Sequence, residues 1–133
     1  MSLTADRPTS RVSTSQLVLR VLYDRGPLSR ADLARATGLT APTISDITTG
    51  LLAEGLVEET GLGPSTGGKR PTLLQVVDDS RHLIGLDLAR GDFRGAVMNL
   101  RGEIRRRVTL PLEDRSGEAA LALVYELVDT LLA

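Results

Sequence analysis

The chain has 133 residues and a net charge of −1, so it can form one ordinary domain or two small ones and has no overall attraction to phosphate. It contains no cysteine, one histidine, one Phe, two Tyr and no Trp, which excludes disulfides, argues against metal sites and leaves an aliphatic core. The sequence has neither a signal peptide nor an apolar run of roughly 20 residues, so we expect a cytoplasmic protein without membrane contact.

Three short helices are predicted after a polar, flexible N-terminal arm at residues 1–13. Apolar residues recur at helical spacing over 15–25, before a Gly-Pro pair that breaks the pattern. A second helix is predicted over 30–37, and Gly38 ends it because glycine adopts the left-handed conformation at little cost. The third helix is predicted over 40–54, beginning with a capping threonine.

A hairpin is predicted after the third helix. Residues 56–60 and 72–77 are strand-like, and the Gly/Pro/Ser-rich stretch 61–68 between them indicates a flexible tip. Two short helices joined by a glycine turn can place the second of them in the major groove of DNA. We therefore expect residues 14–78 to form a winged helix-turn-helix DNA-binding domain.

The remaining residues, 79–133, predict a second piece of structure. Three strand-like runs over 82–89, 93–100 and 104–110 are separated by short glycine-containing turns, which favours an antiparallel meander. Ser116 is expected to cap a final helix. The apolar face of that helix is predicted to comprise Leu121, Val124, Tyr125, Val128, Leu131 and Leu132. Such a piece exposes an edge strand and an apolar face, so we expect either a shortened chain or a dimer.

Residues 15–77 resemble the N-terminal winged helix of the ROK family, which contains sugar-responsive repressors and sugar kinases. The resemblance rests on the segment LSRADLARATGLTAPTISDITTGLLAEGLVEE followed by GGKRPTLLQV. Residues 82–103 resemble the first hairpin of the family's actin-like ATPase domain, so 79–133 would be the N-terminal fragment of that domain. The implied fold class is α+β: a winged helix-turn-helix, then a partial actin-like ATPase (ROK) subdomain with a three-stranded antiparallel meander and one helix.

The resemblance implies a sequence-specific DNA-binding transcriptional regulator, either a sugar-responsive repressor or its DNA-binding portion. Its partners would be double-stranded DNA with a palindromic operator, a second copy in a homodimer and, only in a full-length form, a sugar effector. Hydroxyl groups of the third helix would bond phosphates or base edges, and basic residues of the second helix and the wing would contact the DNA backbone. The implied DNA contacts are Thr40, Thr43, Ser45, Thr48, Thr49, Arg30, Arg35, Lys69 and Arg70.

Two features depart from the family pattern. Asp46 stands where the family often has a basic residue, and no Lys or Arg occurs between Ala36 and Gly68, so low affinity is expected for a single copy. In the kinase-like hairpin Asp87 is retained, but Ala89 replaces the glycine of an Asp-x-Gly-x-Thr-like phosphate turn, so we expect no cofactor and no enzyme activity. A protein-interaction or dimerisation module without DNA affinity, and a remnant of a ROK sugar kinase, stay open as alternatives.

Overall fold

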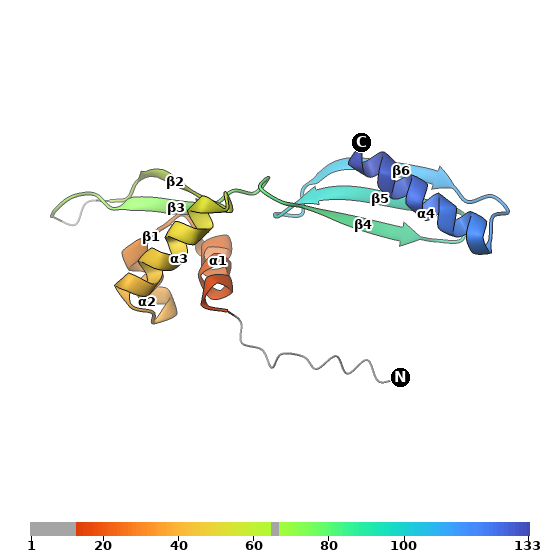
Figure 1. Ribbon diagram of the computed structural model, residues 1–133. Coiled ribbons are helices and arrows are strands. Elements are labelled where there is room, and N and C mark those ends of the chain that lie inside the picture. The colour runs from red at the N-terminus through yellow and green to blue at the C-terminus, as the bar shows by residue number, and fades with distance from the viewer. Residues whose placement is uncertain (1–12, 65–66) are drawn as a thin grey trace, which may run out of the picture. The chain divides into compact units, whose positions relative to one another are not determined.

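The structure, a computed structural model, describes residues 13–64 and 67–133. The chain divides into two compact units, a first unit that ends at Val77 and a second unit that begins at Asp78. Figure 1 shows the helices and small sheet of the first unit and the sheet and single helix of the second. The predicted arm lies outside the described residues except for Ser13. No helix in the described part of the chain is long and apolar enough to cross a membrane.

Three helices and a three-stranded sheet build the first unit. Its elements in chain order are α1 (Thr14–Arg25), β1 (Leu28–Ser29), α2 (Arg30–Thr37), α3 (Ala41–Ala53), β2 (Val57–Leu62) and β3 (Thr72–Val76). The sheet has the order β1-β3-β2, and both pairings are antiparallel. The predicted helices and hairpin are confirmed, whereas β1 was not predicted because a two-residue strand carries no periodicity. The core comprises Val18, Leu22, Leu33, Ile44, Leu51, Val57, Leu74 and Val76.

The turn between α2 and α3 is built as the sequence predicts. Gly38 has a φ of 74°, in the left-handed region, and its N–H donates to the carbonyl of Ala34 at 2.9 Å. Thr40 is the N-cap of α3. Leu33 of α2 and Ile44 of α3 are both 0% exposed, so the core holds the two helices on either side of the glycine turn.

The hairpin of β2 and β3 forms the wing. Its register pairs Val57 with Val76 at the inner end and Leu62 with Thr72 near the tip, with an irregularity after Thr60. Beyond the paired residues, the N–H of Gly63 donates to the carbonyl of Pro71 at 2.8 Å. This bond extends the hairpin toward Lys69 and Arg70.

The second unit is a meander covered by one helix. Its elements are β4 (His82–Leu88), β5 (Asp92–Asn99), β6 (Ile104–Pro111) and α4 (Gly117–Leu132). The antiparallel order β4-β5-β6 confirms the predicted meander. A Cβ on Gly95 of β5 would lie 2.5 Å from a terminal methyl group of Leu131, so a side chain at this position would require Leu131 to shift. Ser116 is the N-cap residue of α4, but its side chain makes no capping hydrogen bond.

The face that helix α4 buries overlaps only in part with the predicted one: Leu131 is buried and Val124 is partly buried against the core, as predicted. The side chains packed into the core are those of Leu123, Leu127 and Leu131, around Phe93 of the sheet. The prediction was wrong for Leu121, Tyr125 and Leu132, which are 53%, 64% and 69% exposed. Because α4 is apolar around most of its circumference, two stripes fit helical spacing, and only the position of the sheet selects between them.

Candidate nucleic-acid interface

The exposed side of α3 carries hydroxyl groups. Thr40, Ser45 and Thr49 are exposed, and Thr43 is half-buried. The Thr40 hydroxyl accepts from the Thr43 N–H at 3.4 Å and donates to the Thr43 hydroxyl at 2.9 Å, so these two groups stabilise the start of the helix. Ser45 and Thr49 stand four residues apart and therefore share one face of the helix. Four of the five hydroxyl residues expected to contact DNA are accessible to a ligand.

Thr48 is the exception. Its side chain is 0% exposed, and its hydroxyl donates to the carbonyl of Ile44 at 2.8 Å. Thr48 lies on the same stripe of α3 as Ile44 and Leu51, which face the core. The expectation that Thr48 contacts DNA is wrong, because a hydroxyl that bonds its own helix backbone on the buried side cannot reach a groove.

The two predicted cations of α2 have carboxylate partners. A terminal nitrogen of Arg30 lies 3.5 Å from a carboxylate oxygen of Glu59 in the wing, and Arg35 is paired with Asp32. The N–H of Ser29 donates to a carboxylate oxygen of Asp32, and the Ser29 hydroxyl accepts from the N–H of Asp32. Hydrogen bonding by the backbone and side chain of Ser29, together with Arg35, holds the pKa of the Asp32 carboxyl below its ordinary value. Asp32 therefore stays ionised near neutral pH, so a phosphate that binds Arg35 must compete with it.

Lys69 and Arg70 stand at the end of the wing tip, immediately before β3. Both side chains are exposed, and among the described residues neither takes part in an ion pair. These are the cations of the predicted interface that a phosphate can contact without displacing a carboxylate. They come from a different element than α3, so the candidate interface is built from two segments distant in sequence.

This surface also includes two residues, Ala41 and Pro42, that were not among the contacts expected from the sequence. Ala41 and Pro42 are exposed in the first turn of α3, next to Thr40. Small apolar groups at the start of a recognition helix can contact the methyl group of thymine. The first turn also carries no acidic residue, so the positive end of the helix dipole is not neutralised there. The exposure of Ala41 and Pro42 is a property of the tertiary structure and gives no signal in the sequence.

The kinase-like hairpin of the second unit carries Asp87 on β4. This residue is exposed and lies directly opposite Arg94 of β5 in the strand register. Asp87 therefore belongs to the β4–β5 strand pair of the second unit, and it is not one of the candidate interface residues of the first unit.

Comparisons with known proteins match both units. A model of the MarR family matches residues 15–70. The chain is 34% identical over 116 residues to the xylose repressor of Caldicellulosiruptor bescii, a match that covers 85% of this chain and 29% of that protein. A solved structure, described as a ROK family transcriptional regulator homologous to the Mlc protein of E. coli, matches with a TM-score of 0.69 and 26% identity, over 86% of this chain and 30% of that one. The chain belongs to the ROK family.

Other ROK relatives are repressors and regulators too. The chain is 29% identical over 122 residues to the DNA-binding transcriptional dual regulator NagC of Escherichia coli (strain K12), over 87% of this chain and 30% of that protein. It is also 29% identical over 124 residues to the xylose repressor of Bacillus subtilis (strain 168), over 93% of this chain and 32% of that protein. The chain spans about a third of the length of these relatives, so the likeness concerns the winged helix-turn-helix and the meander only.

Proposed function

We propose that the winged helix-turn-helix of this ROK chain binds double-stranded DNA sequence-specifically, as the DNA-reading part of a sugar-responsive repressor. The observation that carries the proposal is the exposed hydroxyl face of α3, with Ser45 and Thr49 at its centre. Hydroxyl groups on a helix that follows a glycine turn have the chemistry to bond base edges and phosphates in the major groove. The function needs no enzyme activity, and it implies a cytoplasmic location, where the chromosome lies.

The proposed contacts divide by chemistry. Ser45, Thr49 and Thr43 read base edges, and Thr40 meets a phosphate at the positive end of the helix dipole. Lys69 and Arg70 of the wing contact phosphate or the minor groove, and Arg30 and Arg35 contact the backbone when phosphate replaces their carboxylate partners. Thr48 is left out of the interface.

Because one copy offers few cations, we propose that a homodimer binds a palindromic operator. Each copy reads one half-site, and the half-site centres lie one helical turn of DNA apart, about 34–36 Å, or a multiple of this. The names of the relatives support a sugar effector of the xylose or N-acetylglucosamine type, which acts only in a full-length form of the protein.

The dependence of DNA affinity on salt tests the proposal. If Lys69 and Arg70 of two copies contact phosphate, four cations act, and the logarithm of the affinity should fall with the logarithm of salt concentration with a slope of roughly −3.6. If Arg30 and Arg35 also take part, eight cations act, and the slope should be roughly −7. The absence of salt-dependent binding to DNA would favour the alternative of a protein-interaction module without DNA affinity.

A matched pair of substitutions tests the reading face. Thr49→Val and Thr48→Val remove a hydroxyl from adjacent residues and keep a β-branched side chain, but only Thr49 is exposed. Duplexes selected from a random pool by Thr49→Val should lose the preference at one base pair, whereas those selected by Thr48→Val should match the wild type. Identical selections by all three proteins would contradict the proposed orientation of α3.

A further inference from the structure

The sheet of the second unit has one covered face and one open face. Figure 1 shows α4 lying along one face of the sheet, and a Cβ on Gly95 of β5 would lie within 4 Å of the side chains of Leu127 and Leu131 of that helix. Successive side chains of a strand point to opposite faces, so Arg94 and Ala96, the neighbours of Gly95, stand on the open face. Residues directly opposite each other in the strand register share a face, and the open face can therefore be followed across all three strands.

The open face holds a hollow of about 300 Å³. Its lining on this face comes from two adjacent rows of the strand register, each with one residue from every strand. The rows are Gly85, Ala96 and Arg107, and Asp87, Arg94 and Thr109. The first row forms the floor of the hollow because two of its members have little or no side chain. The charged and hydroxyl groups of the other residues surround this floor.

Gly85 is a glycine that its strand does not need. The register of β4 with β5 runs without irregularity from His82 to Leu88, so Gly85 does not serve a bulge. A Cβ on Gly85 would meet one heavy atom within 4 Å, the terminal methyl carbon of Met98 at 3.3 Å, and the end of a methionine side chain can move aside. Glycine weakens the interior of a strand and often marks a place where a ligand approaches the backbone closely. Gly85 thus keeps the floor accessible to a ligand.

The charged groups around the floor have few partners within the chain. Among the described residues, Arg107 and Asp87 take part in no ion pair. Arg94 reaches a carboxylate oxygen of Asp92 only at 3.5 Å, and the side chains of this pair are 62% and 40% exposed. An exposed ion pair of this kind contributes little free energy, so a ligand can displace it. Both guanidinium groups are therefore accessible to an anion.

The mixture of charges in the lining selects a class of anion. A guanidinium binds a carboxylate through two parallel hydrogen bonds, and two guanidinium groups line the hollow. Asp87 repels a second negative charge, which disfavours a phosphate dianion, but its oxygens accept hydrogen bonds from hydroxyl groups. Thr109 adds a hydroxyl that can donate or accept. The lining therefore matches a molecule with one carboxylate and several hydroxyl groups.

We propose that this hollow binds a small hydroxy acid, a carboxylate with a polyhydroxylated carbon chain. Arg107 and Arg94 hold the carboxylate. Asp87 and Thr109 bind hydroxyl groups of the carbon chain, which lies over the floor. The site is on the face of the strands and not on the turn at 89–91. It requires no DNA, so it goes beyond the proposed function.

Titration of the full chain with D-gluconate, followed by the backbone amide signals in NMR spectra, tests the site. D-gluconate should shift the signals of the strand residues around the hollow, and the shifts should saturate in the millimolar range, because a small ligand on an open surface binds weakly. D-glucose, which lacks the carboxylate, should shift none of these signals. No saturable shift with D-gluconate, or equal shifts with D-glucose, overturns the proposal.

A matched pair of substitutions on β6 tests the guanidinium contact. Arg107→Gln and Arg106→Gln make the same change at adjacent residues, but Arg106 stands on the covered face, where it donates to the carbonyl of Ala133 at 2.7 Å. Arg107→Gln should weaken D-gluconate binding on the order of tenfold, because a charge-assisted hydrogen bond is lost, and Arg106→Gln should leave it unchanged. Equal losses in the two variants would mean that the charge of the strand attracts the acid without the hollow, and the proposal would be wrong.

Inorganic phosphate distinguishes a hydroxy acid from a simple anion. The wild type should bind phosphate more weakly than D-gluconate, and Asp87→Asn should narrow this difference because it removes the repulsion. Gly85→Val fills the floor with a residue that suits a strand, and it should abolish D-gluconate binding while the amide signals of α4 stay in place. Tighter binding of phosphate than of D-gluconate by the wild type, or D-gluconate binding that Gly85→Val leaves intact, overturns the proposal. These measurements involve no DNA, so the proposed function stands or fails separately.

Discussion

Two glycines of the helix-turn-helix should respond in opposite directions to the same added methyl group. Gly38 has a φ of 74°, Gly50 lies inside α3, and at neither would a Cβ meet a heavy atom within 4 Å. For an added methyl group, the two positions therefore differ only in backbone conformation. Alanine in the left-handed region costs about 1–2 kcal/mol, whereas alanine in place of glycine in a helix interior gains about 0.5–1 kcal/mol. Gly38→Ala should lower the free energy of unfolding of the first unit by the former amount, and Gly50→Ala should raise it by the latter.

Urea unfolding followed by tyrosine fluorescence measures both effects. The chain has two tyrosines, and Tyr125 is 64% exposed, so a Tyr125→Phe background leaves Tyr23 as the reporter of the first unit with little disturbance. Measurements at one low protein concentration keep self-association from contributing. The midpoints should move in opposite directions, while the slopes with urea stay equal because the surface exposed on unfolding is the same.

Two outcomes would refute this reasoning. A neutral Gly38→Ala would mean that the turn relaxes to a right-handed conformation without loss, so that the angle between α2 and α3 does not depend on the glycine. A destabilising Gly50→Ala at low concentration would mean that the glycine serves packing within the unit.

Three further predictions follow from the described contacts. Asp32→Ala should lower the free energy of unfolding at pH 7 and leave it unchanged at low pH. The pKa of Asp32 in the folded chain lies below its ordinary value of 3.8, so the carboxylate contributes stability above that value, and this stability is lost as pH falls through the folded-state pKa. Unfolding measured along an acid titration checks this. Glu59→Gln should raise DNA affinity about two- to fivefold by freeing Arg30, with Glu58→Gln as an unchanged control; equal effects in a binding titration would contradict this. Leu127→Ala should lower the free energy of unfolding of the second unit by about 2–5 kcal/mol, measured by thermal unfolding. A larger loss from Leu121→Ala, whose side chain is exposed, would contradict the orientation of α4.

Much of the first unit could be predicted from the sequence because its signals are local. The left-handed glycine at 38 and the capping threonine at 40 act on their own neighbours in the chain, and both are confirmed. The strand-like runs of the wing and the meander are also confirmed, with ends shifted by one or two residues. These features require only that nearby residues favour one backbone conformation.

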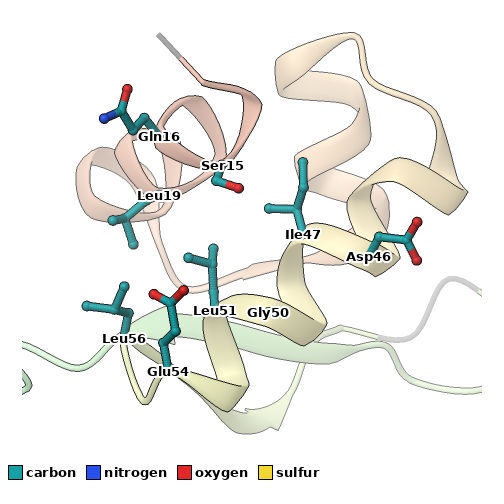
Figure 2. Close-up of a pocket in the computed structure, with 9 residues that line it drawn as sticks. All are labelled: Ser15, Gln16, Leu19, Asp46, Ile47, Gly50, Leu51, Glu54 and Leu56. Atoms are coloured by element: carbon teal, nitrogen blue, oxygen red, sulfur yellow. The ribbon is translucent and has the colours of Figure 1, made fainter.

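The sequence by itself determined where the helices, turns and strands lie, and which family the pattern resembles. Only the tertiary structure decided which side of each helix is buried, because helical spacing defines a stripe but not the neighbour that covers it. This is why Thr48 and Thr49 could not be told apart, and why α4 buries Leu127 while Leu121 stays exposed. The groove that Leu19 of α1 and Leu51 of α3 line (Figure 2) likewise exists only where these two helices pack together, since segments about 30 residues apart in the sequence form its two walls.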